Sequence, residues 1–292
     1  MHRFLRAVGF SKIESRADIV RLMQETVDNS MECKFSTFYE NTLYGDYIRN
    51  VGERMGLVVC GETDEYDEFF PETIYPYFTA GQVTTSEKSS IDKHIQTDTF
   101  GGVCEDSRIA ISIIYFLQNR IDYMRNCLND DEGLRGVSVS LSGLSDSGMI
   151  MMPIAKDENT KKKVYKSERK RDKLIKAAKD GNEEAIESLT LKDLDMYASI
   201  SEKIHKSDLY TIVDTYFMPY GIECDLYSVM GEIEELKLVP NILTGEEIYQ
   251  MKLQCNGILL DVCINKLDLY GEPEVGRRFK GNIWLQGKLN FQ

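Results

Sequence analysis

The dipeptide Asn256-Gly257 restricts the fold more than any other feature, because it stands between two runs of alternating apolar residues. Asn-Gly is the strongest short-range signal for a two-residue β-hairpin turn. Counting outward from it places apolar residues opposite one another on one face: Cys255 with Ile258, Leu253 with Leu260, Met251 with Val262, and Tyr249 with Ile264. We therefore predict a hairpin in this register, with Lys252 and Asp261 forming a charge pair on the other face.

Periodicity predicts further elements in the first half of the chain. Residues 11–30 carry apolar side chains at helical spacing and are predicted to form a helix. The apolar and β-branched content of residues 56–60, 108–118 and 137–141 is typical of strands. A solvated acidic loop is predicted at 61–72, and the turn residues at 145–148 predict a turn.

A basic segment divides the chain. Residues 156–179 contain eleven Lys or Arg and four acids, a local charge of +7 in a chain of formal net charge −13. We predict a helix there, ended by Gly181, a second helix over 183–204, and strands after Leu209. The resulting division is an N-terminal α+β unit at 1–155, a basic helical linker at 156–182 and a C-terminal α+β unit at 183–292. The predicted fold class is α+β, with mostly antiparallel sheet and flanking helices.

The two halves of the chain share a series of glycines, cysteines and a strand ending in the same order. Each half runs from Gly to Cys to Gly to Val-Cys and then to a strand ending in aromatic-Leu-Gln. The two endings are 116–118 and 284–286. This pattern raises the hypothesis of two duplicated α+β units.

Composition points to an intracellular protein. The seven cysteines are odd in number and form no CxxC pair, which favours reduced thiols in a cytoplasm. The first residues lack the apolar core of a signal peptide, and no apolar run approaches the length of a membrane span. The acidic remainder of the chain disfavours nucleic acid as a partner, since phosphate binding requires a broad basic face. For the basic helix, a solvated linker is favoured over contact with nucleic acid or an anionic membrane.

The segment at 276–287 carries the strongest candidate site. Arg277, Arg278 and Lys280 stand next to the single tryptophan, Trp284. The three cations either neutralise nearby acids such as Glu272 and Glu274, or bind a carboxylate or phosphate of a small anionic ligand.

Other chemistry is sparse. His94 and Cys104 are candidates for an acid–base or metal role, with a structural histidine as the alternative. The segment 143–148 lacks the second glycine of a nucleophile elbow, and the acids near residue 65 lack calcium-loop spacing. Nucleotide-binding glycine motifs do not occur. We therefore predict no catalytic residue, no metal site and no cofactor.

Four segments resemble a known family. They are "MHRFLRAVGFS", "YFLQN", "FMPYGIECD" and "GEPEVGRRFKGNIWLQG", which together span the chain. They are similar to an uncharacterised family of about this length from clostridial bacteria, known only as a domain of unknown function. The resemblance implies a bacterial cytoplasmic protein and assigns no functional residue.

Two functional hypotheses stay open. The first is a non-enzymatic binding or regulatory protein, with a protein partner or a second copy of itself. The second is an enzyme or sensor that acts on a small anion through Arg277, Arg278 and Lys280. Convergence of these residues with His94 and Cys104 in one pocket would favour the second.

Overall fold

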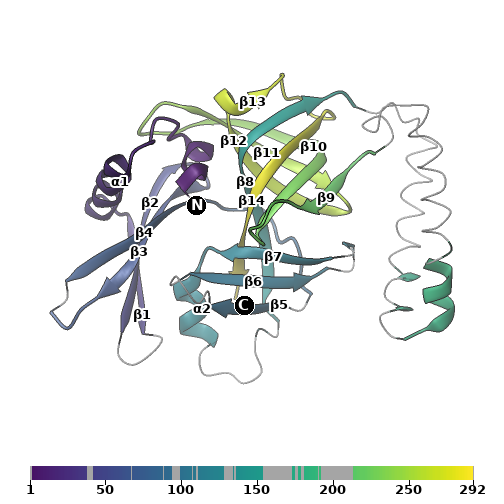
Figure 1. Cartoon of the computed structure of the whole chain (residues 1–292), viewed down its shortest axis with the longest axis horizontal. Coiled ribbons are helices and arrows are strands. Elements are labelled where there is room, and N and C mark those ends of the chain that lie inside the picture. Colours follow the sequence, from purple (N-terminus) through teal and green to yellow (C-terminus); the bar gives the residue numbers. More distant parts are fainter. Residues whose placement is uncertain are drawn as a thin grey trace.

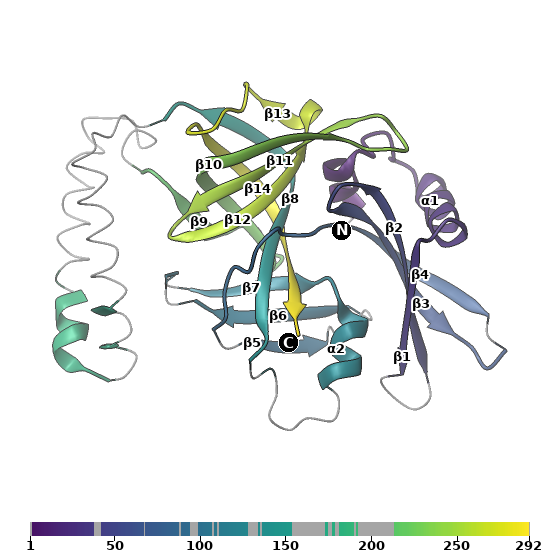
Figure 2. The ribbon, with the colours of Figure 1, turned by 180° about the vertical axis from the view of Figure 1, so that it is seen from behind.

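The computed structural model describes residues 2–37, 42–66, 68–87, 89–93, 99–106, 108–109, 111–127, 134, 136–153, 173–174, 177–178, 181–189, 191 and 213–291. These residues are mostly β-strand and form a four-stranded sheet A and a ten-stranded sheet B. Figures 1 and 2 show sheet A on one side of the molecule and sheet B in the centre. None of the described helices combines the length and apolar character needed to cross a membrane.

Sheet A is antiparallel, with its strands in sequence order. They are β1 (Glu32–Thr37), β2 (Leu43–Gly52), β3 (Met55–Thr63) and β4 (Phe69–Phe78). β3 contains the predicted strand 56–60. The acidic loop predicted at 61–72 is wrong in extent, because β3 and β4 continue into it. The Asp64 side chain accepts hydrogen bonds from the N–H groups of Tyr66 and Glu68 and tightens this connection into a short turn.

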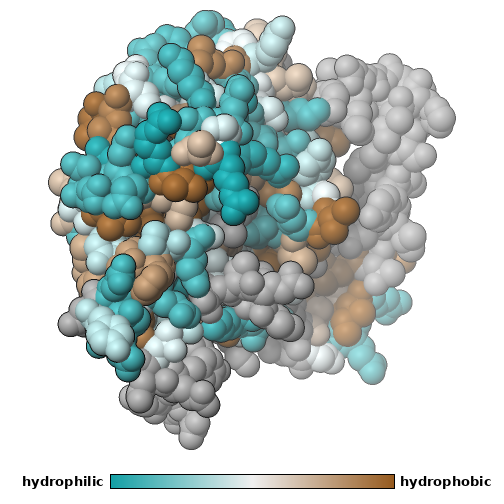
Figure 3. All heavy atoms as spheres, turned by 60° about the vertical axis from the view of Figure 1, so that its left-hand side comes forward, coloured by the Kyte–Doolittle hydropathy of each residue, from teal (hydrophilic) through white to brown (hydrophobic). Residues whose placement is uncertain are grey.

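Helix α1 (Arg16–Asp28) confirms the helix predicted at 11–30. It begins where the Ser15 hydroxyl accepts a hydrogen bond from the N–H of Asp18 while the Asp18 carboxylate accepts one from the N–H of Ser15. This capping box satisfies two N–H groups of the first turn, so the helix starts later than periodicity alone indicates. The helix packs on β2 and β3 and buries Leu22 and Thr26. The exterior on this side of the molecule is largely hydrophilic, with scattered apolar residues (Figure 3).

Five of the ten strands of sheet B close into a ring. The strands are β5 (Ser89–Lys93), β6 (Phe100–Glu105), β7 (Ser112–Leu117), β8 (Ser138–Met151), β9 (Tyr216–Pro219), β10 (Leu226–Pro240), β11 (Glu247–Cys255), β12 (Ile258–Asn265), β13 (Leu269–Tyr270) and β14 (Arg278–Asn290). The ring runs β8-β12-β11-β10-β14 and closes where β14 pairs with β8. The second half of β14 also pairs with β7, and β6 and β5 follow.

The described sheets are mostly antiparallel, as predicted, although sheet B is mixed. Its parallel pairings are β12–β8, β13–β8 and β14–β7. β8 is one continuous strand, so the turn predicted at 145–148 is wrong. Asp146 is instead the extra residue of a bulge, where Ser145 pairs with Ile283 and Ser147 with Asn282. The Ser145 hydroxyl donates to the carbonyl oxygen of Asn282 or of Ser147, which explains how turn-forming residues fit inside a strand.

The β11–β12 hairpin confirms the predicted register, including Cys255 opposite Ile258 and Lys252 opposite Asp261. Asn256 and Gly257 have φ of 45° and 81°, as a two-residue turn of this type requires. The predicted Lys252–Asp261 charge pair is wrong. Lys252 pairs with Glu235 on β10, while Asp261 is 1% exposed and pairs with Arg54 at 2.6 Å. Both faces of β12 are buried, so the partner of Asp261 comes from sheet A and is Arg54.

Two apolar cores flank the wall of the ring. The first lies between the strands of sheet B and includes Val229, Leu253, Val262 and Ile283. The second joins sheet A to the outside of the ring and includes Trp284. The 3-10 helix η1 (His2–Val8) contributes Phe4, Leu5, Ala7 and Val8 to the second core and contacts β4, β8 and β12. A second, short 3-10 helix, η2 (Lys266–Asp268), precedes β13.

Helix α2 (Arg120–Cys127) follows β7 and was not predicted. The Arg120 guanidinium is buried and donates to Asp46 of β2 at 2.8 Å and to the carbonyl oxygen of Gly45 at 3.1 Å. α2 therefore fastens sheet A to the β5–β7 part of sheet B through a charged contact, which periodicity does not reveal.

The predicted duplication is not confirmed by the strand order. The first set of landmarks spans both sheets, with Cys60 in β3 of sheet A and Cys104 in β6 of sheet B. In the second set, Cys224 lies in the turn before β10 and Cys263 lies in β12 of the ring. Matching landmarks thus occupy different structural positions.

The division at 1–155, 156–182 and 183–292 stays a prediction, because most of the linker lies outside the described residues. Its described part supports the predicted helix end at Gly181. The N–H groups of Gly181 and Asn182 donate to the carbonyl oxygens of Ala178 and Ala177, and Gly181 has a φ of +84°. Residues 183–189 are helical. Sheet B contains strands from both sides of the linker.

Candidate functional site

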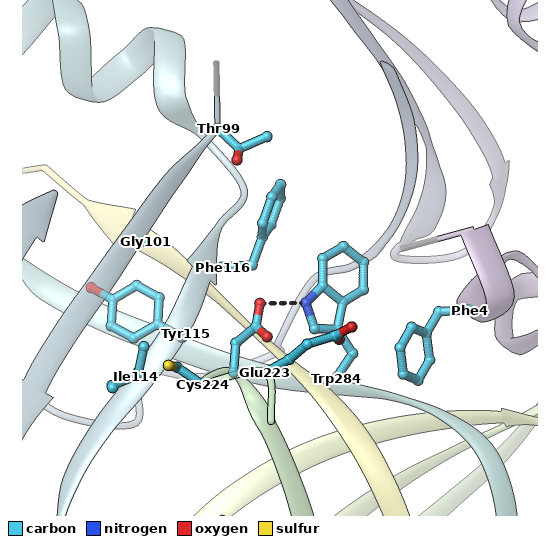
Figure 4. Close-up of a pocket in the computed structure, with 10 residues that line it drawn as sticks. Phe4, Thr99, Gly101, Ile114, Tyr115, Phe116, Glu223, Cys224 and Trp284 are labelled. Atoms are coloured by element: carbon cyan, nitrogen blue, oxygen red, sulfur yellow. Dashed lines mark hydrogen bonds between the residues drawn. The ribbon is translucent and has the colours of Figure 1, made fainter. Parts of the chain in front are cut away.

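A cavity of about 290 Å³ lies where η1, β6, β7, β14 and the β9–β10 turn meet. Figure 4 shows residues from these separate elements around the indole of Trp284, with Phe4 on one side of it and Tyr115 on the other. The lining residues are Phe4, Thr99, Gly101, Ile114, Tyr115, Phe116, Glu223, Cys224, Asp225 and Trp284. The cavity therefore depends on the closure of the ring and on the docking of η1.

Three aromatic rings form one wall. Phe4 stacks on Trp284 with ring centroids 5.6 Å apart, and Phe116 meets Trp284 at 4.9 Å. All three side chains are at least 97% buried, so packing holds the rings in place. Trp284, noted in the sequence only as the single tryptophan, is the centre of this wall.

Asp225 fixes the orientation of the indole. Its carboxylate accepts a 2.7 Å hydrogen bond from Nε1 of Trp284, shown dashed in Figure 4. Its backbone carbonyl accepts a 2.8 Å bond from the N–H of Leu285. The β9–β10 turn is thereby attached to β14 at two points. Gly221 makes the turn possible, because its φ of +78° is one that other residues rarely adopt.

The same turn carries the polar residues of the cavity. Glu223 and Cys224 are exposed, while Asp225 is half-buried. Cys224 is a free thiol. The described lining residues include two carboxylates and no Lys, Arg or His.

Tyr115 lies against the backbone on both sides. A Cβ atom on Gly102 would lie 2.1 Å from its ring, and one on Gly287 would lie 2.2 Å away. Only glycine permits this approach at either position. Burial raises the pKa of the Tyr115 hydroxyl, which keeps the phenol neutral, and Figure 4 shows it directed away from Trp284. Tyr115 is thus a structural part of the floor.

The three predicted cations, Arg277, Arg278 and Lys280, have different neighbours in the structure. Arg277 pairs with Glu274 at 2.9 Å and donates to the carbonyl oxygen of Glu272, which matches the alternative in which it neutralises nearby acids. Arg278 is 4% exposed and donates to the carbonyl oxygens of Met152 and Val213, and burial lowers its pKa. Lys280 lies in β14 between Met149 and Met230 of the neighbouring strands.

The second predicted pair is not brought to these cations. His94 lies outside the described residues. Cys104 is fully buried in the first core, and burial raises the pKa of its thiol to about 12. At neutral pH the thiolate that nucleophilic or metal chemistry requires is scarce. Among the described residues, no group of three or more His, Cys, Asp or Glu side chains could hold a metal ion.

Residues 5–287 match a family described as a domain of unknown function from an E. rectale gene, DUF3881. The chain belongs to the DUF3881 family. This confirms the predicted membership of an uncharacterised clostridial family. Neither the curated proteins nor the solved structures gave a match.

The four segments that carry the resemblance to the DUF3881 family meet at the cavity. They supply Phe4, Tyr115 and Phe116, the acidic turn from Glu223 to Asp225, and Trp284. The cavity was not predicted from the sequence, because the candidate sites were chosen for their charged residues and the lining is mostly aromatic and apolar. The signal that could have found it is the joint occurrence of aromatic residues in all four segments.

Proposed function

We propose that this protein is a non-enzymatic, small-molecule-binding regulatory protein of the bacterial cytoplasm, with its ligand site in the cavity around Trp284. One observation carries the proposal: four segments distant in sequence build one aromatic-walled cavity whose central indole is fixed by Asp225. Ligand sites typically combine apolar walls with a few fixed polar groups, and the volume lies near the lower end of their usual range.

Binding is favoured over catalysis by the arrangement of the polar groups. Among the residues that line the cavity, Cys224 is a possible nucleophile, and the carboxylates of Glu223 and Asp225 flank it in the sequence. The Asp225 carboxylate, however, is committed to the indole of Trp284. An activated nucleophile requires a base that is oriented toward it. The Asp225 carboxylate is oriented toward Trp284 instead.

The alternative, an enzyme or sensor for a small anion at Arg277, Arg278 and Lys280, receives less support. Arg277 and Arg278 donate to acceptors of the protein itself, and Arg278 is almost fully buried. A protein partner or a second copy of the chain is compatible with ligand-dependent regulation. The free cysteines among the described side chains suit a reducing cytoplasm.

The test is a thermal-shift screen with small neutral, cationic and anionic metabolites. Ile114→Trp places a larger side chain in the cavity. Ile111→Trp is the matched control, because Ile111 is exposed and lies just before the same strand. We expect at least one compound to raise the Tm of the wild type and of Ile111→Trp but not of Ile114→Trp. A shift that persists in Ile114→Trp, or the absence of any shift, would contradict the proposal.

The two exposed thiols supply an independent measurement on the unaltered chain. Cys224 lines the cavity, whereas Cys33 lies in β1. A ligand found in the screen should slow the labelling of Cys224 by a thiol reagent and leave the rate at Cys33 unchanged. Equal protection of both thiols would indicate a general effect on stability instead of a site.

A further inference from the structure

We infer that the corner of sheet B around strand β13 is the surface through which two copies of this chain associate. We call it the β13 surface. It consists of five exposed, large apolar side chains: Met149, Met152, Leu267, Tyr270 and Val275. Figures 1 and 2 show β13 at the upper margin of the molecule. The β13 surface shares no residue with the lining of the cavity, so the inference goes beyond the proposed function.

The five side chains come from elements that lie side by side. Tyr270 of β13 is paired with Met149 of β8, so these two side chains leave the sheet on the same face. The 3-10 helix η2, which carries Leu267, also contacts β8. Val275 lies in the loop from β13 to β14, which the Arg277 guanidinium tightens by donating to the carbonyl oxygen of Glu272. An exposed apolar patch of this kind marks an interaction site.

The exposed area is close to what a stable dimer requires. The five residues are 45–84% exposed, and Tyr270 has the largest value. Because an aromatic side chain presents about 150–250 Å² and an aliphatic one less, they offer about 500–700 Å² together. A specific interface takes about 800 Å² from each partner. The β13 surface thus supplies most of one half of such an interface.

The free edge of β13 favours a second copy as the occupant. Among the described strands β13 pairs with β8 alone, so no described strand lies along its other edge. Exposed apolar edge strands pair readily with another chain. A two-fold axis beside β13 brings the same edge of two copies together and places each Tyr270 against the apolar side chains of the other copy. Since β13 has only two residues, these side chains supply most of the contact.

The charges around the β13 surface allow like copies to approach each other. The net charge of −13 opposes self-association in general. Beside this surface, however, acids and bases occur in ion pairs, so the surroundings are close to neutral. The pairs are Lys266–Glu247, Arg6–Asp268, Arg277–Glu274 and Arg3–Asp146. A partner with a strong charge of either sign gains little attraction here, whereas a second copy loses little to repulsion.

The experiment is sedimentation velocity of the full chain over a range of concentrations. We expect a monomer–dimer equilibrium with a Kd in the micromolar range, because the interface lies at the lower end of the usual size. Tyr270→Glu places a charge on both sides of the two-fold axis and should weaken association by about ten-fold or more. Tyr66→Glu is the matched control, because Tyr66 is 80% exposed in the β3–β4 turn and lies outside the β13 surface.

A second pair of variants repeats the comparison with methionine. Met152→Glu should weaken association, whereas Met31→Glu, at a residue of nearly equal exposure before β1, should not. Weakening by Tyr270→Glu and Met152→Glu, with both controls like the wild type, is the result that supports the inference. A wild-type chain that stays monomeric at every concentration would overturn it. Association that neither Tyr270→Glu nor Met152→Glu weakens, or that the controls weaken equally, would overturn it as well.

Salt separates an apolar interface from one between opposite charges. Association through the β13 surface should persist or strengthen in about 0.5 M NaCl, because salt screens the repulsion between two anionic chains. Dissociation by salt would indicate contact between the basic segment 156–179 of one copy and the acidic remainder of the other, and would contradict the inference. The cavity variant Ile114→Trp should associate as the wild type does, so the dimer and the proposed ligand site can fail separately.

Discussion

Gln118 and Gln286 meet side chain to side chain: Nε2 of Gln118 donates to Oε1 of Gln286 over 2.7 Å. Each side chain also donates a hydrogen bond to a carbonyl oxygen of β4. Gln118 donates to Phe78 at 2.9 Å, and Gln286 donates to Pro76 at 2.8 Å. The pair therefore joins the edge of sheet A to sheet B. Phe116 and Trp284 each lie two residues earlier, Phe116 in β7, which ends just before Gln118, and Trp284 in β14. One strand-to-strand contact thus positions both the sheet junction and the aromatic wall.

Replacing Gln286 should destabilise this junction. Gln286 is fully buried, so Gln286→Leu removes the side-chain donor to the carbonyl oxygen of Pro76 and one of the acceptors of the Gln118 amide, which keeps the carbonyl oxygen of Phe78. An unsatisfied buried polar group costs about 1–3 kcal/mol, and we expect a loss of about 1–3 kcal/mol in the free energy of unfolding, measured by urea denaturation.

The matched control for Gln286→Leu is Gln254→Leu, a half-buried glutamine in β11. It should change stability by less than about 0.5 kcal/mol. Similar losses in both variants would show that the network around Gln286 has no special role.

The ion pair between Asp46 and Arg120 gives a second prediction. Both residues are at most 3% exposed. Burial raises the pKa of Asp46, and the opposing charge of Arg120 limits that rise. Arg120→Met leaves a buried carboxylate without its cation and should cost about 3–5 kcal/mol in urea denaturation. The double variant Asp46→Leu with Arg120→Met should recover most of this loss.

Arg125→Met, at an exposed position of α2 whose guanidinium donates to the carbonyl oxygen of Phe35, is the control for Arg120. It should cost less than about 1 kcal/mol. A double variant as unstable as Arg120→Met alone would refute the explanation by an uncompensated charge.

Asp106 predicts a pH dependence of stability. Burial alone would raise the pKa of its carboxyl group, but hydrogen bonds from the side chain and N–H of Arg108 outweigh burial and lower it. A lowered folded-state pKa stabilises the fold above the unfolded-state value and loses that contribution as pH falls through the folded-state value. Between about pH 4 and pH 2, wild type should therefore lose more stability than Asp106→Asn.

At neutral pH, Asp106→Asn should cost about 1–2 kcal/mol, because it weakens hydrogen bonds to a charged acceptor. Urea denaturation of both proteins across this pH range measures the difference. Parallel curves for wild type and variant would contradict the assignment to Asp106.

Neighbouring arginines predict a contrast at the start of β14. Arg278 donates to the carbonyl oxygens of Met152 and Val213, which lie on opposite sides of the intervening basic segment in the sequence. Arg278→Met should speed hydrogen exchange in β9 and at the end of β8, and Arg278→Lys should not rescue it, since one ammonium does not reproduce the guanidinium fork. Arg277→Met, which removes an exposed ion pair, should leave exchange unchanged. Equal effects of Arg277→Met and Arg278→Met would exclude this bridging role.

Much of the local structure was predictable. The register of the β11–β12 hairpin, the helix containing Leu22 and the helix end at Gly181 follow from turn residues, periodicity and caps that act within a few residues. The turn predicted at 145–148 failed because pairing with β14 continues past it and accommodates Asp146 as a bulge. Asp261 likewise found Arg54 instead of the neighbouring Lys252, because sheet A covers its face of the ring.

The sequence by itself determined elements whose energetics are local: the β11–β12 hairpin and the capped helix α1. Only the tertiary structure decided the closure of β14 on β8, the meeting of Gln118 with Gln286, and the contact of Asp225 with Trp284 across 59 residues. Each of these requires strands distant in sequence to come into register. The free energy of such contacts depends on which surfaces are buried together, and no local pattern records that choice.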